Sequence, residues 1–362
     1  MNKITFFFEK KHFYLICLVL ILALNKIYEE IIENKLIKPH KITTGLYLFY
    51  NKVFGYIGQS LLLIPYTIYY YKNKANDKNY TLKEKKIMEI LSLLYKKKGI
   101  LKKYSLNFLL FSTFILSLME IFTSVFQESI IKSVIKNSSV AVANYLEIQI
   151  CIIFFSDPIF FNKKLYSHQY LSFFCFLIFL IIKFIKNAIK LGFLKVLYDF
   201  FYNIIYYFFV GLRLVLLKYL IDYFYINGYV LLGIEGLYDL IFYIIFYYFS
   251  FGSEKNIFKT KYWILFFIRS FLNFIIQIFF ILVITIFEPI FCAFSTCPIL
   301  IFSYIIEKKF NKNIFINSLV IIIYCFFILV FSEIIQLNFL GLNKNTRKNI
   351  RIRERIEYAI ND

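Results

Sequence analysis

Two carboxylates stand within the apolar stretch GIEGLYDL, which covers residues 233–240. Glu235 and Asp239 are four residues apart, so a helix presents both on one face. An ionised side chain is costly in hydrocarbon and therefore normally faces a partner or a water-filled cavity. Such acids either contact a polar solute or pair with an internal cation. Gly233 and Gly236 would let a neighbouring helix approach this segment closely.

Other charged residues lie inside apolar segments as well. Glu120, Glu147 and Arg269 lie deep in such segments and, with Glu235, are the better candidates for a cavity lining. An ion pair between a carboxylate and Arg269 remains an equal alternative to solute contact. A second group lies nearer the predicted ends of the membrane spans, where charged side chains can reach the interface or cap a helix; it comprises Asp199, Arg213 and Glu288.

These charged residues lie on predicted membrane helices. Of 362 residues, 60% are hydrophobic and 22% are aromatic, which excludes an ordinary water-soluble domain. Apolar runs long enough to cross a bilayer recur along the chain, and we predict an all-α fold of about ten transmembrane helices. The predicted spans are 11–29, 46–70, 106–127, 139–161, 168–187, 192–217, 228–251, 262–282, 284–306 and 314–337.

Two similar segments suggest an internal duplication. A span end, paired lysines, a polar turn and an apolar span follow one another at Lys163-Lys164 and again at Lys308-Lys309. A repeat unit of five spans has an odd number, so the second copy would be inverted in the membrane. We therefore expect one membrane domain over 1–343, with repeat one at about 1–187 and repeat two at about 192–343.

Positive charge is concentrated in two polar segments. The chain carries a formal charge of +20, and residues 71–105 hold eleven lysines and three acids. We expect a basic cytosolic loop here, with an interfacial helix, and a basic cytosolic tail at 344–362. Both segments flank spans and neither belongs to a nucleic-acid-binding fold, so we expect contact with anionic lipids and not with nucleic acid. An even number of spans would place both termini in the cytosol.

The sequence lacks the usual marks of membrane enzymes. Its three histidines are far apart, and its six cysteines lie in apolar segments without the spacing of a zinc site or a disulfide scaffold. Neither a phosphate-binding GxxxxGK[ST] motif nor a GxSxG motif is present. We therefore expect no catalytic site, no metal and no cofactor, which disfavours a lipid-modifying enzyme.

Residues 210–251 resemble the nucleotide-sugar-transporter-like family F branch of solute carrier 35, in the drug/metabolite transporter superfamily. In that family a Gly-Thr-Glu-Gly-Leu signature opens the seventh span, and here residues 233–237 read GIEGL. Weaker similarities are His40, the Gly58-Gln59 pair, Glu120 and the NYLE segment at 144–147. The resemblance implies ten spans in two inverted repeats, alternating access, an endomembrane location and Asn144 as a further cavity candidate.

The chain departs from that family at several positions. Gln59 replaces an acid, Glu147 stands where the family usually has arginine, and residues 291–303 lack another arginine. Because arginines would anchor an anionic ligand, their absence disfavours nucleotide sugars and favours a cationic or neutral solute.

We expect a secondary transporter of small organic solutes, with a homodimer left open. The alternative is a non-transporting membrane scaffold derived from a carrier. The complete set of cavity candidates is Glu120, Asn144, Glu147, Glu235, Asp239 and Arg269.

Overall fold

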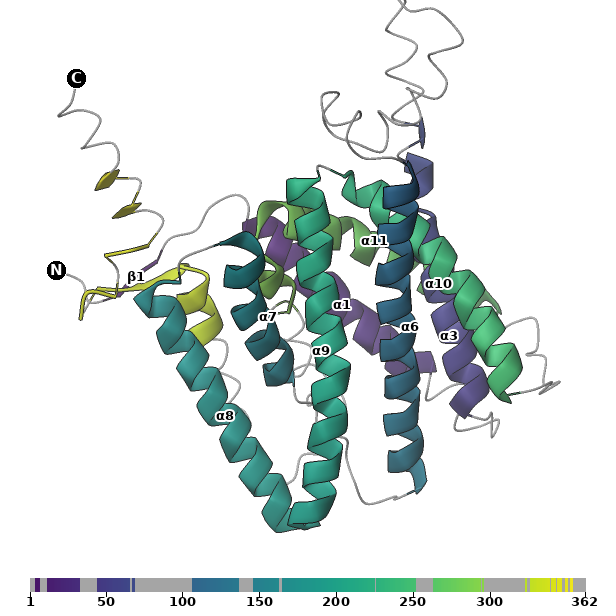
Figure 1. The fold of residues 1–362 in the computed structure, drawn as a ribbon, viewed down its shortest axis with the longest axis horizontal. Coiled ribbons are helices and arrows are strands. Elements are labelled where there is room, and N and C mark those ends of the chain that lie inside the picture. Colours follow the sequence, from purple (N-terminus) through teal and green to yellow (C-terminus); the bar gives the residue numbers. More distant parts are fainter. Residues whose placement is uncertain are drawn as a thin grey trace, which may run out of the picture.

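The structure is a computed structural model, and its fold is a bundle of helices (Figure 1). It describes residues 4–6, 12–32, 44–65, 67–68, 106–136, 146–162, 165–224, 226–251, 263–293, 295, 323, 326–338, 340–342, 344–346, 349–350 and 352–353. The predicted basic loop at 71–105 lies outside the described residues, as do about half of the predicted ninth and tenth spans and much of the tail.

Long helices make up most of the described chain. In chain order they are α1 (His12–Ile32), α3 (Thr44–Ser60), α6 (Leu106–Lys136), α7 (Leu146–Phe161), α8 (Ser167–Leu191), α9 (Phe193–Tyr223), α10 (Gly228–Phe251) and α11 (Trp263–Ile286). Five segments of these helices are long and apolar enough to cross a membrane, namely Asn107–Ser124, Ser167–Ile189, Phe193–Tyr223, Gly228–Phe246 and Phe266–Ile286. The described helices are therefore those of an integral membrane protein, as the composition predicts.

Helix boundaries differ from the predicted spans at three places. Helix α9 continues to Tyr223, six residues past the predicted end. The join between α8 and α9 is the single residue Gly192, whose φ of 92° is open to glycine but strained for other residues. After α11 the helix resumes at 289–293, with Pro289 as its first residue.

A short two-stranded ladder was not predicted. Strand β1 (Ile4–Phe6) pairs antiparallel with β2 (Ile335–Leu337), with Thr5 opposite Gln336. The predicted tenth span runs to residue 337, but its described helical residues end at 331. The helix stops there because Glu333 has a φ of 62°, outside the helical region. Figure 1 shows β1 beside the end of the bundle at which α8 begins.

Helix α3 packs against both α10 and α11. Tyr56 of α3 contacts Tyr243 of α10, whereas the later residue Gln59 bonds the earlier residue Leu232, so α3 and α10 run antiparallel. Against α11, Tyr50 contacts Trp263 and Gly58 lies beside Ser270, so α3 and α11 run parallel. Helix α3 is thus held between two helices of opposite direction.

Further helix pairs complete the packing of the bundle. Phe108 of α6 contacts Phe224 at the end of α9, and Phe122 contacts Phe209, so these helices are antiparallel. Helices α1 and α11 are antiparallel too, because His12 contacts Phe287 and Arg269 donates to Asn25. Helix α10 packs on α6, and α7 and α8 pack on α9. Helices α3, α10, α6 and α9 are thus linked, each to the next, by direct packing contacts.

Candidate functional site

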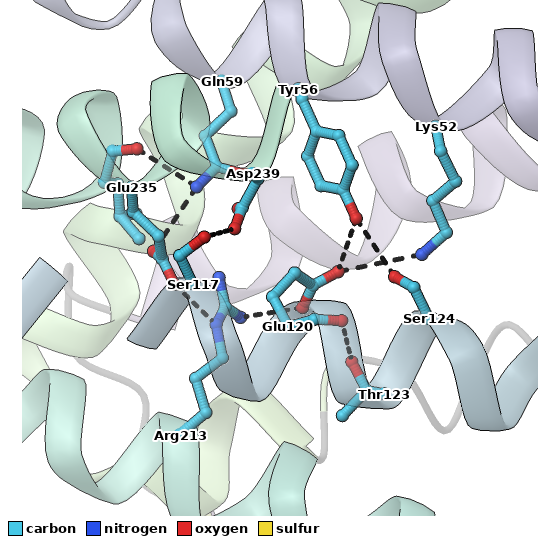
Figure 2. A network of polar contacts seen from close by, with 11 residues as sticks. Lys52, Tyr56, Gln59, Ser117, Glu120, Thr123, Ser124, Arg213, Glu235 and Asp239 are labelled. Atoms are coloured by element: carbon cyan, nitrogen blue, oxygen red, sulfur yellow. Dashed lines mark hydrogen bonds and ion pairs between the residues drawn. The ribbon is translucent and has the colours of Figure 1, made fainter. Parts of the chain in front are cut away.

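Four helices bring polar side chains together inside the bundle (Figure 2). Helix α3 contributes Lys52, Tyr56 and Gln59, whose spacing of four and then three residues places them on one face. We call the whole set the ionic cluster; its other members are Ser117, Glu120 and Ser124 of α6, Arg213 of α9, and Glu235 and Asp239 of α10.

Arg213 is the central cation of the ionic cluster. Its Nε donates to Oε1 of Glu235 at 2.8 Å, and its Nη1 lies 3.7 Å from Oε2 of Glu120. Figure 2 shows the guanidinium between these two carboxylates, which come from different helices. The Glu235 side chain has no exposed surface, and that of Arg213 is 15% exposed. Arg213 therefore neutralises a fully buried acid.

The rest of the ionic cluster completes the environment of Glu120 and Glu235. Lys52 Nζ lies 3.7 Å from Oε1 of Glu120, and the Tyr56 hydroxyl is 3.5 Å from the same oxygen. Gln59 Nε2 donates to the backbone oxygen of Leu232 at 3.1 Å and lies 3.4 Å from Oε2 of Glu235. Glu120 and Lys52 are 20% and 26% exposed, so the cluster is more open at their end.

Asp239 lies at the buried end of the cluster. It has no exposed surface, and Ser117 Oγ donates to its Oδ1 at 2.5 Å. Its Oδ2 has no hydrogen-bond partner in the described part of the chain. As predicted from their spacing, Asp239 and Glu235 share a helix face.

The predicted close approach at the α10 glycines is confirmed. A Cβ atom added to Gly236 would lie 2.9 Å from the backbone nitrogen of Ser60, and one added to Gly233 would lie 2.7 Å from the Leu63 side chain. Contacts below 3.0 Å require a neighbour to shift, so both positions depend on glycine. This contact brings α10 close enough to α3 for Gln59 to reach Glu235.

The predicted candidates fall into three groups. Glu120, Glu235 and Asp239 meet in the ionic cluster. Arg269 lies on α11 and donates to Asn25 of α1, so this bond joins a different pair of helices. Asn144 lies outside the described residues, as does the side chain of Glu147, whose backbone belongs to α7.

Sequence reasoning placed Arg213 at a span end and did not propose Lys52, Tyr56, Ser117 or Ser124. The helical spacing of Lys52, Tyr56 and Gln59 was the signal that could have identified the α3 face. Arg213 lies ten residues before the end of the apolar helix α9 at Tyr223. A charged residue that far inside an apolar helix was the signal that could have identified it as a member of the site.

The ionic cluster contains groups that can bind ions or polar solutes but not an evident metal centre. In the described ranges, no group of three or more His, Cys, Asp or Glu side chains is placed to hold a metal ion. The chain matches no model of a known protein family, and no curated protein matches it either.

Proposed function

We propose that this protein is a secondary transporter of small organic solutes that works by alternating access, of the drug/metabolite transporter type. The observation that carries the proposal is the ionic cluster, in which three carboxylates and two cations from four helices meet inside an apolar bundle. Charged side chains within a membrane are costly, and in transporters they mark the route of ions and substrates.

The depth of the cluster agrees with a transport site. Asp239 lies eleven positions beyond the start of α10, and Ser117 lies eleven beyond the start of α6. At 1.5 Å per residue this is about 16 Å, or roughly half of a hydrocarbon core about 30 Å thick. Substrate and ion sites of secondary transporters lie near the midplane, at the interface between repeats.

The packing pattern supports ten helices in two inverted five-helix repeats. A shift of five helices relates α1 to α9, α3 to α10 and α6 to α11. Under this exchange the α3–α11 contact becomes the α10–α6 contact, and the α1–α11 contact becomes the α9–α6 contact, all of which occur. The α3–α10 pair maps onto itself and is antiparallel, as two related helices in inverted repeats must be.

The strand ladder supports an even number of membrane crossings. Strand β1 precedes α1, and β2 follows the helical residues 326–331 of the predicted tenth span. Because the two strands pair, both lie at one end of the bundle. The basic segments at 71–105 and 344–362 favour the cytosol for that end by the positive-inside rule. The resemblance to family F of solute carrier 35 favours an endomembrane compartment.

The charge of the cluster favours a cationic or neutral solute. Arg213, its most buried cation, is already paired with Glu235 and Glu120. An anionic ligand would have to displace a carboxylate from the guanidinium, whereas a cation would meet an excess of negative charge. This preference agrees with the absence of the arginines that the related family has at spans four and nine.

A flux assay tests the proposal. The purified full-length protein is reconstituted in liposomes and given a defined mixture of amines, amino acids, nucleosides and sugars under proton and sodium gradients. We expect at least one solute to accumulate by mass spectrometry above empty liposomes, and Glu235→Gln to reduce its uptake at least tenfold. If the folded protein moves none of them and instead co-purifies with a stoichiometric partner, the scaffold alternative holds.

A further inference from the structure

Asp239 differs from the other two acids of the ionic cluster in its partners. Glu120 lies near Lys52 and Arg213, and Glu235 forms an ion pair with Arg213 at 2.8 Å. Asp239 accepts a hydrogen bond from the neutral Ser117 hydroxyl, and its buried Oδ2 has no hydrogen-bond partner in the described ranges. Asp239 is therefore the acid whose charge is least compensated.

The charge balance of the cluster leads to the same residue. Lys52 and Arg213 supply two positive charges against three carboxylates, which leaves one negative charge in excess. The ionisable groups that act on Asp239 are Tyr56 of α3, Glu120 of α6, Arg213 of α9 and Glu235 of α10. The described part of α11, which also packs on α10, adds none to this set. One bound monovalent cation would neutralise the site.

A proton fits the geometry at Asp239 better than a metal cation does. A proton needs a single acceptor atom, and Oδ2 provides a buried one. Hard metal cations need several oxygen ligands at once. In the part of the chain that the structure describes, no three acidic, histidine or cysteine side chains are arranged to share one.

We propose that the carboxyl group of Asp239 is the binding site for a proton that the transporter exchanges for its solute. This inference rests on the proposed transport function. An unpaired carboxylate in an apolar interior is neutralised by a proton, because burying the bare charge costs too much free energy. Release of that proton restores the excess negative charge, which then attracts a cationic solute. Proton and solute thus compete for the same carboxylate charge and are carried across the membrane in opposite directions.

Infrared titration tests the proton site without any solute. The full-length protein in lipid vesicles is titrated with acid, and the carbonyl stretch of protonated carboxyl groups is followed. We expect a titrating band that is present in the wild type and in Asp222→Asn but absent from Asp239→Asn. Asp222 is a matched control because it is an acid of α9 paired with Lys218 at a half-exposed position. Asp239→Glu, which keeps a carboxyl group, should restore the band.

Two infrared results would overturn the proton site. One is a band that persists unchanged in Asp239→Asn while that variant keeps the wild-type circular dichroism spectrum. The other is a wild-type band that responds to added Na⁺ at constant pH, which would assign the site to sodium.

Gradient-driven flux tests the coupling separately. For one-for-one exchange, a difference of one pH unit supports about a tenfold accumulation of the solute. We expect wild-type vesicles to respond in this way, and Asp239→Asn vesicles, which lack the charge that proton and solute share, to lose the pH-driven accumulation. Wild-type flux that does not change with the pH gradient would contradict the proton coupling but would still support the transport function. An Asp239-dependent infrared band with no flux of any solute would support the proton site and overturn the transport function.

Discussion

Arg213 joins three helices through charge, since it binds Glu235 of α10 and Glu120 of α6 from its own position on α9. Its role was missed because the predicted span ended at residue 217, just before Lys218 and Asp222. Those charges do not end the helix. Lys218 lies 3.2 Å from Asp222 one turn away and donates to the backbone oxygen of Thr285 at 3.1 Å, so its charge is compensated within the bundle.

At this scale we predict the effect of Arg213→Ala on stability. Removing the guanidinium leaves the fully buried Glu235 without its cation, and breaking a buried pair on one side costs about 3–5 kcal/mol. The midpoint of thermal unfolding in detergent, followed by intrinsic fluorescence, should therefore fall clearly below that of the wild type.

A double-mutant cycle separates this effect from lost packing. Glu235→Gln removes the charge that Arg213→Ala leaves unpaired, so the double variant should be less destabilised than the sum of the single variants by about 0.5–3 kcal/mol. Strict additivity of the two effects would show that the two side chains are not coupled.

At the scale of elements, α3 owes its position to close contacts on two sides. A Cβ atom added to Gly58 would lie 2.2 Å from the backbone oxygen of Ser270 on α11. A backbone atom cannot move aside as a flexible side chain can, so the clash would force the two helices apart. On the other side, Gly236 of α10 accommodates Ser60 and Gln59. These two contacts orient the α3 face that carries Lys52, Tyr56 and Gln59 into the ionic cluster.

Gly58 and Gly55 form a matched pair for testing this contact. Gly58→Ala should force α3 and α11 apart and cost about 1–3 kcal/mol, as overpacked substitutions do. Gly55→Ala meets its nearest atom, Nδ2 of Asn273, at an ordinary 3.9 Å, and should be neutral or stabilising by up to about 1 kcal/mol because alanine favours helix. Thermal unfolding of both variants measures the difference. Equal effects would contradict the close approach at Gly58.

At the scale of the whole molecule, β1, which precedes the first helix, pairs with β2, which follows the helical residues 326–331. Ile4, Thr5 and Phe6 lie opposite Leu337, Gln336 and Ile335. Residues directly opposite in an antiparallel ladder have Cβ atoms about 4.5–5.5 Å apart, near the range that a disulfide spans. This distance makes the ladder accessible to a cross-linking experiment.

We predict that Thr5→Cys and Gln336→Cys form a disulfide in a chain whose six native cysteines are replaced. A single protease site placed in 71–105 lets the linked halves be recognised, because they stay together until a reductant is added. The control is Thr5→Cys with Leu340→Cys, since Leu340 is 92% exposed but lies outside the ladder. Faster cross-linking in the control pair would contradict the register.

The amino-acid sequence was sufficient to predict a membrane protein, most of its described helices and part of the candidate site. Apolar runs are a local property, so the helices follow from them, and the spacing of Glu235 and Asp239 placed both acids on one face. The small residues at 233 and 236 likewise predicted a close helix contact. Asn144 and the side chain of Glu147 lie outside the described residues, so their place in the cavity stays a prediction.

The cation that faces these acids and the pairing of β1 with β2 followed only from the packing of the helices. In a membrane, lipid-facing and partner-facing residues are almost equally apolar, so hydrophobicity does not encode which helices touch. The choice of Arg213 for Glu235, with Arg269 bonded to Asn25, depends on how α9, α10, α1 and α11 pack. The β1–β2 ladder depends in the same way on contacts between segments more than three hundred residues apart.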